Sequence, residues 1–341
     1  MKQQDSSILV TVRCLAYNHA PYIRQCLEGF VMQKTSFRFQ VIIHDDASTD
    51  GTDDIIREYA EKYPDIIVPI FETENQYSKR NGAISRQMNR LMKGTYAAYC
   101  EGDDYWTDPL KLEKQVSFLE QHPDYIMACN RTQLFSQKKG RFVGETLCYS
   151  SDRDISAEDT ILHGGLYIPS CSSVYRWNIR DSFTDYCKNS PVGDYPLQIM
   201  CAMKGKIRYF SDCMSVYRVD IPTSWMGKRK TINSEEQLHK RVDELSREMD
   251  MLKGFADDYP AYRKYCNSRI NYAYYTNYPG DSRFNPIYRE LLLPKIPCHT
   301  LGWKVLVAIK KNKIPFTRKP IFDALQKRFG AVNHFYKTKE Q

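Results

Sequence analysis

The first hundred residues alternate short apolar, β-branched runs with segments in which apolar residues recur at helical spacing. The apolar runs predict strands at residues 8–12, 39–43, 66–71 and 96–100. The segments between them predict helices at residues 21–33, 53–63 and 82–93. Strands that alternate with helices in this way predict an α/β fold with a mostly parallel central sheet flanked by helices. Ligands of such sheets bind beyond the carboxyl ends of the strands, so the chemistry is expected there.

The pattern changes after about residue 105, where helices, short strands and loops mix. Residues 234–252 predict a long helix whose apolar positions fall at heptad spacing: Leu238, Val242, Leu245, Met249 and Leu252. A coiled coil usually sustains more heptads, so packing against the same subunit is favoured. Residues 255–290 are rich in Tyr and predict further helical core. We therefore expect a first domain over residues 1–225 and a mostly helical C-terminal region over residues 226–341.

Acidic residues follow two of the predicted strands directly. Glu101-Gly102-Asp103-Asp104 comes after the strand at 96–100, and Asp45-Asp46 comes after the strand at 39–43. Crowded carboxylates ionise together only beside a cation, and hard oxygen ligands suit Mg²⁺ or Mn²⁺. The alternative for the first cluster is a solvated acidic turn. The second cluster either caps the next helix or accepts hydrogen bonds from a base or ribose, and both can hold at once.

Two further residues have a structural and a functional interpretation. Asp194 lies where a helix begins, so it is either a helix cap or a general base that faces a pocket. Arg86 lies on the predicted helix at 82–93, where it either faces a phosphate or is simply solvated. The seven histidines show no HExxH spacing, and we assign none of them a role.

Missing motifs narrow the class of protein. The sixteen glycines form no GxGxxG, no GxxxxGK[ST] and no GxSxG. These absences argue against a dinucleotide dehydrogenase, a P-loop NTPase and an α/β-hydrolase. What remains is an α/β protein that binds a metal and a nucleotide.

Charge is concentrated at the C-terminal end. The formal net charge is +8, but residues 291–341 alone carry about +9, so the basicity belongs to a tail and does not indicate a nucleic-acid-binding protein. Apolar residues at near-helical spacing among these lysines and arginines suit either an amphipathic segment on an anionic membrane or a helical subdomain with solvated charges.

Other features indicate a cytoplasmic chain. No apolar run approaches the roughly 18 residues of a membrane span, and the first twenty residues do not resemble a signal peptide. The eleven cysteines form no CxxC pair, which favours a reducing compartment. We expect a cytoplasmic protein, with the basic tail as a candidate contact with the inner face of the cell membrane.

Four ordered motifs resemble those of family 2 glycosyltransferases, in particular the bacterial branch that builds surface polysaccharides and lipopolysaccharide. They are VTVRCLAYNHAPYI at 10–23, HDDASTDGT at 44–52, NGAISRQMN at 81–89 and EGDDYW at 101–106. The resemblance covers about residues 6–225. It implies a GT-A fold, which is Rossmann-like, a UDP-, GDP- or dTDP-sugar donor, Mn²⁺ or Mg²⁺, and inversion at the anomeric carbon.

The resemblance also implies roles for individual residues. Asp103, with Asp104 beside it, matches the metal-binding acid of the DxD element, in which Glu101 replaces the usual first Asp. Asp194 matches the catalytic base, and Gly193 replaces the Glu that commonly precedes it. The positions matched on the nucleotide side are Thr11, Ala16 and Tyr17 around the base, Asp45 or Asp46 on uracil or thymine, and Arg86 facing the nucleotide. Trp225 falls where an acceptor-side loop is expected.

The expected function is an inverting, metal-dependent glycosyltransferase that acts on a hydroxyl of a glycan or a lipid-linked acceptor. A sugar nucleotidyltransferase would need a Gly-rich signature near the first strand, which Ala16-Tyr17-Asn18-His19 does not supply. A non-catalytic nucleotide- or glycan-binding protein would not need Asp103, Asp104 and Asp194 together. A protein that binds nucleic acid through the tail would show salt-dependent DNA binding.

Overall fold

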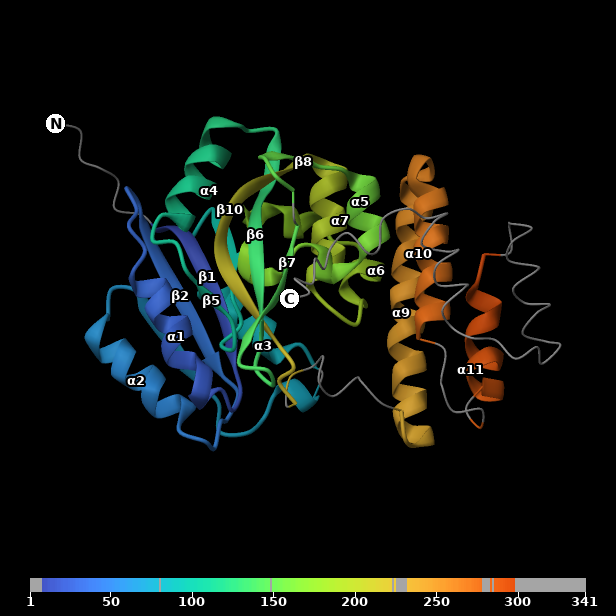
Figure 1. Ribbon diagram of the computed structural model, residues 1–341, viewed down its shortest axis with the longest axis horizontal. Helices are drawn as coiled ribbons and strands as arrows, with labels where there is room; N and C mark the ends of the chain where they lie inside the picture. Colours follow the sequence, from blue (N-terminus) through green and yellow to red (C-terminus); the bar gives the residue numbers. More distant parts are fainter. Residues whose placement is uncertain are drawn as a thin grey trace.

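The computed structural model describes residues 8–297, except 80, 148, 223, 225–231, 278–282 and 284. These residues form one ten-stranded sheet with helices packed around it (Figure 1). The strands are β1 (Ile8–Ala16), β2 (Arg38–Asp45), β3 (Ile67–Phe71), β4 (Tyr96–Tyr99), β5 (Tyr105–Trp106), β6 (Tyr125–Ser136), β7 (Arg141–Thr146), β8 (Arg153–Ile155), β9 (Val174–Arg176) and β10 (Lys206–Val219). The helices are α1 (Ala20–Val31), α2 (Thr52–Lys62), α3 (Ala83–Arg90), α4 (Lys111–Gln121), α5 (Ala157–His163), α6 (Asp185–Lys188), α7 (Asp194–Lys204), α9 (Glu235–Asp258), α10 (Arg263–Thr276) and α11 (Asn285–Leu292).

The first half of the sheet is parallel, as the sequence predicts. Its spatial order is β3-β2-β1-β4, and every neighbouring pair in it runs parallel. The buried faces of β1 and β2 carry the apolar, β-branched residues that suit a strand covered on both sides. Both strands run further than predicted, to Ala16 and Asp45, so their ends lie beside the acidic residues.

The second half of the sheet is mixed. β9 runs antiparallel between β4 and β6, β10 runs parallel to β6, and β5 pairs antiparallel with the far edge of β10. β7 and β8 add short antiparallel pairings to β6 and β10. The expected α/β class is therefore present, with its antiparallel strands confined to the part of the chain after β4.

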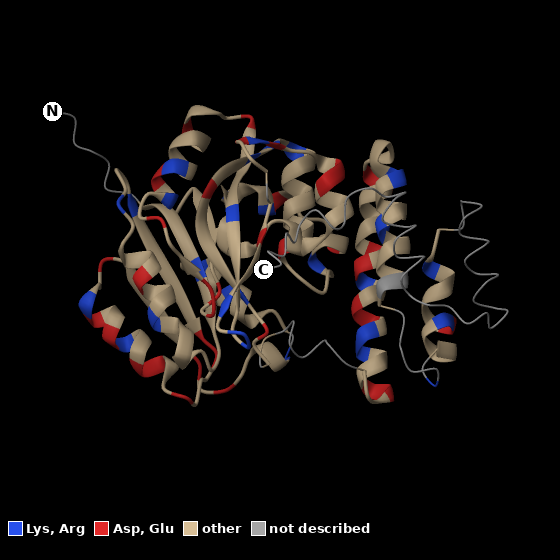
Figure 2. Cartoon of the chain, viewed as in Figure 1, with Lys and Arg blue, Asp and Glu red and all other residues tan. Residues whose placement is uncertain are grey.

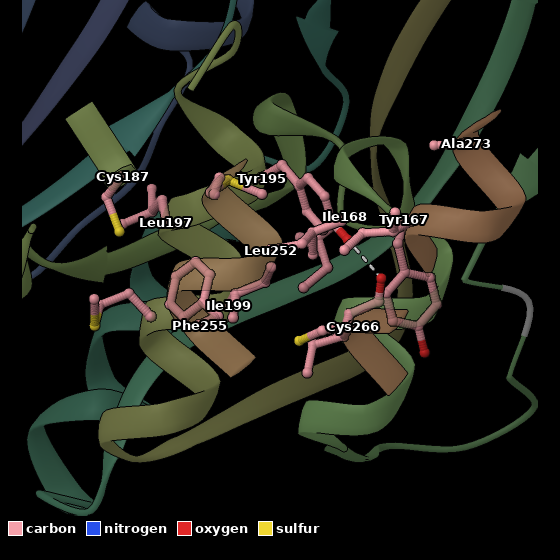
Figure 3. Close-up of a cluster of buried hydrophobic side chains, with 14 of the residues drawn as sticks. Tyr167, Ile168, Cys187, Tyr195, Leu197, Ile199, Leu252, Phe255, Cys266 and Ala273 are labelled. Carbon is pink, nitrogen blue, oxygen red and sulfur yellow. Dashed lines mark hydrogen bonds between the residues drawn. The ribbon is translucent and has the colours of Figure 1, made fainter. Parts of the chain in front are cut away.

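The C-terminal helices pack against the body of the chain. α9 contacts α6, α10 and α11, and α10 also contacts α5 (Figure 1). The five heptad positions predicted from the sequence are all buried, and they join one apolar cluster with residues of α7. Figure 3 shows part of this cluster, with Leu252 and Phe255 of α9 beside Leu197 and Ile199 of α7. The long helix thus packs within its own subunit, and it supports the helix that begins at Asp194.

Within the part of the chain that the structure describes, no helix combines the length and the apolar character needed to cross a bilayer. Residues 298–341, which make up most of the basic tail, lie outside the described residues, and so does the prediction of a membrane-surface helix there.

Candidate active site

The carboxyl ends of β1 and β2 meet at one edge of the sheet. Ala16 and Asp45 are direct partners in the parallel register, and the backbone N–H of Asp46 donates to the carbonyl of Ala16 at 2.9 Å. Asp45 and Asp46 are buried, whereas the ring of Tyr17 is 42% exposed. In Figure 2 the acidic segments gather toward this edge. Ala16, Tyr17, Asp45 and Asp46 are therefore brought together, with an aromatic ring open to solvent beside them.

The loop after β1 is held rigidly against the loop after β2. Asn18 adopts a left-handed conformation (φ 54°), its N–H donates to Ser48 Oγ at 2.9 Å, and its Oδ1 accepts from the N–H of Thr49 at 2.9 Å. The next residue, His19, donates its backbone N–H to Thr52 Oγ1 at 2.8 Å. Asn is one of the residues that tolerates positive φ, and it also bridges the loops here. The position of His19 is thus fixed by both loops.

The two acids after β2 each organise backbone. Asp45 accepts from the N–H of Ser48 at 3.1 Å and from its hydroxyl at 2.5 Å. Asp46 accepts from the N–H groups of Gln76 and Tyr77 at 2.7 and 3.0 Å. Burial raises the pKa of Asp45, and the bonds from Ser48 partly offset this. Both carboxylates keep further lone pairs for a ligand, and their predicted role toward a base stays a prediction.

The acidic loop after β4 is packed directly on the His19 loop. The N–H of Gly102 donates to the carbonyl of Leu15 at 2.8 Å. A Cβ atom at position 102 would lie only 2.8 Å from His19 Nδ1 and 3.0 Å from Ile23 Cδ1. A side chain at Gly102, the second residue of EGDD, would therefore force the imidazole of His19 to move, because the ring occupies the space of a Cβ atom.

Asp103 faces the open side of this loop. Its side chain is 16% exposed, and its Oδ2 lies 4.0 Å from His19 Nε2. Its carboxylate accepts no hydrogen bond from the described residues, whereas its backbone carbonyl accepts from the guanidinium of Arg218. Burial lowers the pKa of His19, and the nearby charge of Asp103 opposes this shift. The carboxylate of Asp103 is thus the acid of this loop that is best placed to meet a ligand.

Its two acidic neighbours are more deeply enclosed. Asp104 is 1% exposed, its Oδ1 accepts from the backbone N–H of Arg218 at 2.8 Å, and its Oδ2 has no partner among the described residues. Burial, together with the charges of Asp103 and Asp194, raises the pKa of Glu101 to about 8, against the opposing charge of Arg13. Glu101 is therefore near enough to both the metal-binding candidate and the candidate base to be affected by their charges.

Asp194 is the first residue of α7, so the acid stands at a helix start as predicted. It is not the cap, which is Gly193; its Oδ1 instead accepts from the N–H of Tyr195 at 2.8 Å. A Cβ on Gly165 would lie 3.2 Å from Asp194 Oδ1, so the carboxylate rests on glycine backbone. Burial raises the pKa of Asp194, and the Tyr195 N–H partly offsets this. A carboxylate with a raised pKa in a half-buried position is suited to accept a proton.

Two predicted site residues lie apart from this group, and a third is outside the described residues. Thr11 is fully buried inside β1, where its hydroxyl accepts from Gln40 Nε2 and from the backbone N–H groups of Lys93 and Gly94 at 3.0–3.3 Å. Arg86 is exposed on α3, and its Nη1 donates to the carbonyl of Asn81 at 2.6 Å. Trp225 lies outside the described residues. The roles assigned to these three residues stay predictions.

The contacts of Thr11 lead to a testable expectation. Thr11→Val keeps the shape of the side chain but leaves two backbone N–H groups without their acceptor, and the Gln40 amide keeps only its bond to the carbonyl of Leu91. Such losses cost about 1–3 kcal/mol per buried group, so the free energy of unfolding should fall by that order. Urea unfolding would measure the loss, and a donor titration would accompany it. An unchanged unfolding midpoint together with a weakened donor affinity would instead favour the predicted role in base binding.

His19 and Arg218 belong to the site, although neither was predicted to have a role there. Arg218 is buried, and it supports both aspartates of the acidic loop from β10. Nothing local marks it, because it lies 114 residues from Asp104 in the chain. The place of His19 in the site could have been predicted from its position in the chain. It follows directly on Tyr17-Asn18, the turn after β1, at the edge where ligands of parallel sheets bind.

The donor atoms at this edge suit a divalent cation that arrives with phosphate. Among the described residues, no three His, Cys, Asp or Glu side chains converge as a ready metal site. Within the described part of the chain, the Asp103 carboxylate accepts no hydrogen bond, and Asp104 Oδ2 is a buried oxygen without a partner. Mg²⁺ is commonly held by one or two carboxylates together with substrate phosphates and water. These residues fit such a cation, and a nucleotide would complete its coordination.

Comparison with known proteins identifies the family. The model described as "Glycosyl transferase family 2" matches residues 12–187, more than half of the chain, so this chain belongs to glycosyl transferase family 2. An uncharacterized protein of Mycobacterium tuberculosis is 37% identical over 209 residues, which cover 61% of this chain and 58% of that protein. The match thus spans less than two thirds of the length of the first curated relatives.

Solved structures show the same fold. TarS 1-349 of S. aureus, in complex with UDP-GlcNAc, superposes with a TM-score of 0.54 at 15% identity over 85% of this chain and 82% of that one. The mannosyltransferase PcManGT of Pyrobaculum calidifontis, in complex with GDP-Man and Mn²⁺, gives a TM-score of 0.51 at 15% identity over 95% and 88%. The expected GT-A fold is therefore confirmed.

Proposed function

We propose that this chain is an inverting, metal-dependent glycosyltransferase that moves a sugar from a nucleotide-diphosphate sugar to a hydroxyl group of a glycan or lipid-linked acceptor. One observation carries the proposal. Burial and the charges of Asp103, in the loop after β4, and of Asp194, at the start of α7, raise the pKa of Glu101, so both carboxylates lie close enough to Glu101 to act on it. In the proposal, a metal-binding acid and a base thus serve one site, as a displacement reaction requires.

The donor would lie along the edge formed by β1, β2 and β4. The exposed ring of Tyr17 offers a face on which a base can stack, and Asp45 and Asp46 offer acceptors beside it. Asp103 would hold the cation with Asp104 beside it. When bound, the cation stabilises the negative charge that develops on the diphosphate leaving group. The structures with UDP-GlcNAc and with GDP-Man and Mn²⁺ support this class of donor.

Asp194 would take the proton of the acceptor hydroxyl. A hydroxyl is a poor nucleophile until a positioned base removes its proton in the transition state. Single displacement needs the base on the side of the sugar opposite the leaving group. The proposal therefore places Asp194, at the start of α7, across the sugar from Asp103, in the loop after β4. The further proposals are a role in surface polysaccharide or lipopolysaccharide synthesis and a contact of the basic tail with the inner face of the membrane.

The test is the release of nucleoside diphosphate from UDP-, GDP- and dTDP-sugars, with Mn²⁺ or Mg²⁺ and with chelator. We expect slow hydrolysis of one donor class that chelator abolishes. Pyrophosphate formation from a nucleoside triphosphate and a sugar phosphate would favour a nucleotidyltransferase instead. If no sugar nucleotide binds or turns over, the proposed function is wrong.

The raised pKa of Asp194 predicts the pH dependence of the reaction. The base works only when ionised, so turnover is lost as the pH falls through its pKa. Burial places this pKa above the value of about 3.9 of a free Asp, so the loss should begin at a higher pH than an ordinary Asp would give. The measurement is kcat against pH with acceptor present. The same acid limb should persist in Glu101→Gln, which removes the neighbouring carboxyl group that also titrates. A profile that is flat down to pH 4 would contradict the assignment.

A further inference from the structure

A pair of glycines separates Asp194 from the C-terminal helices. Gly165 lies against the carboxylate of Asp194, where a Cβ would be 3.2 Å from Oδ1. Gly164, in a left-handed conformation (φ 76°), lies against Arg269 of α10, where a Cβ would be 2.5 Å from Nη2. The guanidinium of Arg269 therefore packs against Gly164, the residue next to the glycine that contacts the Asp194 carboxylate.

Arg269 is held in this place by α9 and α7. Its Nη2 donates to Glu248 Oε1 of α9 at 3.2 Å, and both side chains are about 15% exposed (16% and 15%). Its guanidinium carbon lies 5.7 Å from the centre of the Tyr195 ring, which follows Asp194 in the chain. The Tyr195 hydroxyl donates to the carbonyl of Ile161 at 2.5 Å, just before the two glycines. Arg269 thus contacts both chain segments that fix Asp194, while it neutralises Glu248.

Glu248 is the charged group that acts on Asp194 from the helical side. Its negative charge raises the pKa of Asp194. On the sheet side, Asp194 interacts electrostatically with Glu101 and with the phenol of Tyr217 on β10. Burial raises the pKa of both groups, and the charge of Asp194 adds to this effect. The effect of the Glu248 charge on the pKa of Asp194 therefore depends on how far the guanidinium of Arg269 compensates that charge.

We propose that Arg269 and Glu248 form a positioning pair for Asp194, through which the two C-terminal helices set the placement and the ionisation of the base. Neither residue reaches the reacting atoms. This inference rests on the proposed function for its meaning in catalysis, but the charge coupling that it asserts exists without turnover. The proposal gives α9, which carries Glu248, and α10, which carries Arg269, a role in positioning the base.

The test is the titration of the Asp194 carboxyl group by ¹³C NMR in full-length protein with labelled Asp, with Asp194→Asn to assign the signal. Glu248→Gln removes the negative charge, so the pKa of Asp194 should fall. Arg269→Met removes the cation bonded to Glu248 and leaves the weaker interaction with Arg241, so the pKa of Asp194 should rise. We expect shifts of about half a unit or more in opposite directions. Arg269→Lys keeps the charge and should restore most of the wild-type value.

A purely structural role would not produce opposite shifts. The double variant Glu248→Gln/Arg269→Met removes both charges and should titrate near the wild-type value, so the proposal stays testable if Arg269→Met alone fails to fold. The matched control is Arg263→Met, which breaks the exposed pair of Arg263 with Asp257 and should leave the titration unchanged. Equal titration curves in wild type, Glu248→Gln and the double variant would overturn the proposal. Failure of donor turnover in the wild type would count against the proposed function and not against this coupling.

Discussion

Asp194→Asn should lower kcat for sugar transfer by about 10²–10⁴-fold, which is the usual contribution of a positioned general base. Asparagine keeps the size of the side chain and can still accept from the N–H of Tyr195. It cannot take a proton, so the loss should fall on the chemical step. Binding of the nucleoside diphosphate should stay close to that of the wild type, because the base side of the donor lies at the ends of β1 and β2.

Asp185→Asn is the matched control for this substitution. Asp185 is also the first residue of a helix, α6, but its side chain is 93% exposed. This variant should keep wild-type turnover. If Asp194→Asn retains more than about a tenth of the wild-type kcat, the base is another group, since a lost general base costs far more than that.

Asp103→Asn should abolish the effect of divalent cations on nucleotide binding and lower kcat/KM by at least about 10²-fold. The amide carries no charge, and the cation loses a carboxylate that accepts no hydrogen bond from the described residues. Calorimetric titration of nucleoside diphosphate with and without Mn²⁺ would measure the first effect, and donor hydrolysis the second. In the wild type, cation and nucleotide should each tighten the binding of the other by the same factor, because coupling between two sites is reciprocal.

The control for Asp103 is Asp124→Asn. Asp124 forms an exposed ion pair with Lys206 at 2.8 Å, and such pairs contribute little to stability. Nucleotide binding by the Asp124→Asn variant should depend on Mn²⁺ as in the wild type. A wild-type response to Mn²⁺ in Asp103→Asn would place the cation elsewhere.

The parallel half of the fold could be predicted because its signals are local. Each strand at 8–12, 39–43 and 66–71 is a short apolar run, and each helix between them has an apolar stripe. The extent of the strands was harder to read, because polar residues at a strand's end look like a loop. β1 continues to Ala16, so Thr11 lies inside the sheet, whereas the resemblance to the family implied a place beside the base.

The mixed half could not be predicted, because its pairings are distant in the chain. β10 pairs with β6 from Tyr125 to Ser136, about eighty residues away, and the register depends on how both pack. The helices that end the described chain gave a clear heptad pattern, which correctly indicated burial within the subunit but did not say which face of the sheet they cover.

In the candidate site, too, positions set by local patterns could be predicted, whereas contacts between distant segments could not. The sequence placed Asp45, Asp46 and Asp103 at strand ends and Asp194 at a helix start, since these positions follow from local patterns. It gave no means to see that the His19 ring takes the space above Gly102, because that contact depends on two loops meeting across the sheet edge.

Anomalous diffraction from crystals grown with Mn²⁺ and a nucleoside diphosphate is the most direct test of the central claim that this edge binds the donor. Data would be collected for the wild type and for Asp103→Asn near the manganese absorption edge. We expect an anomalous peak within bonding distance of the Asp103 carboxylate, with the nucleotide beside Tyr17 and the ends of β1 and β2, and no peak in the variant. A cation or nucleotide bound away from this edge in the wild type would contradict the account.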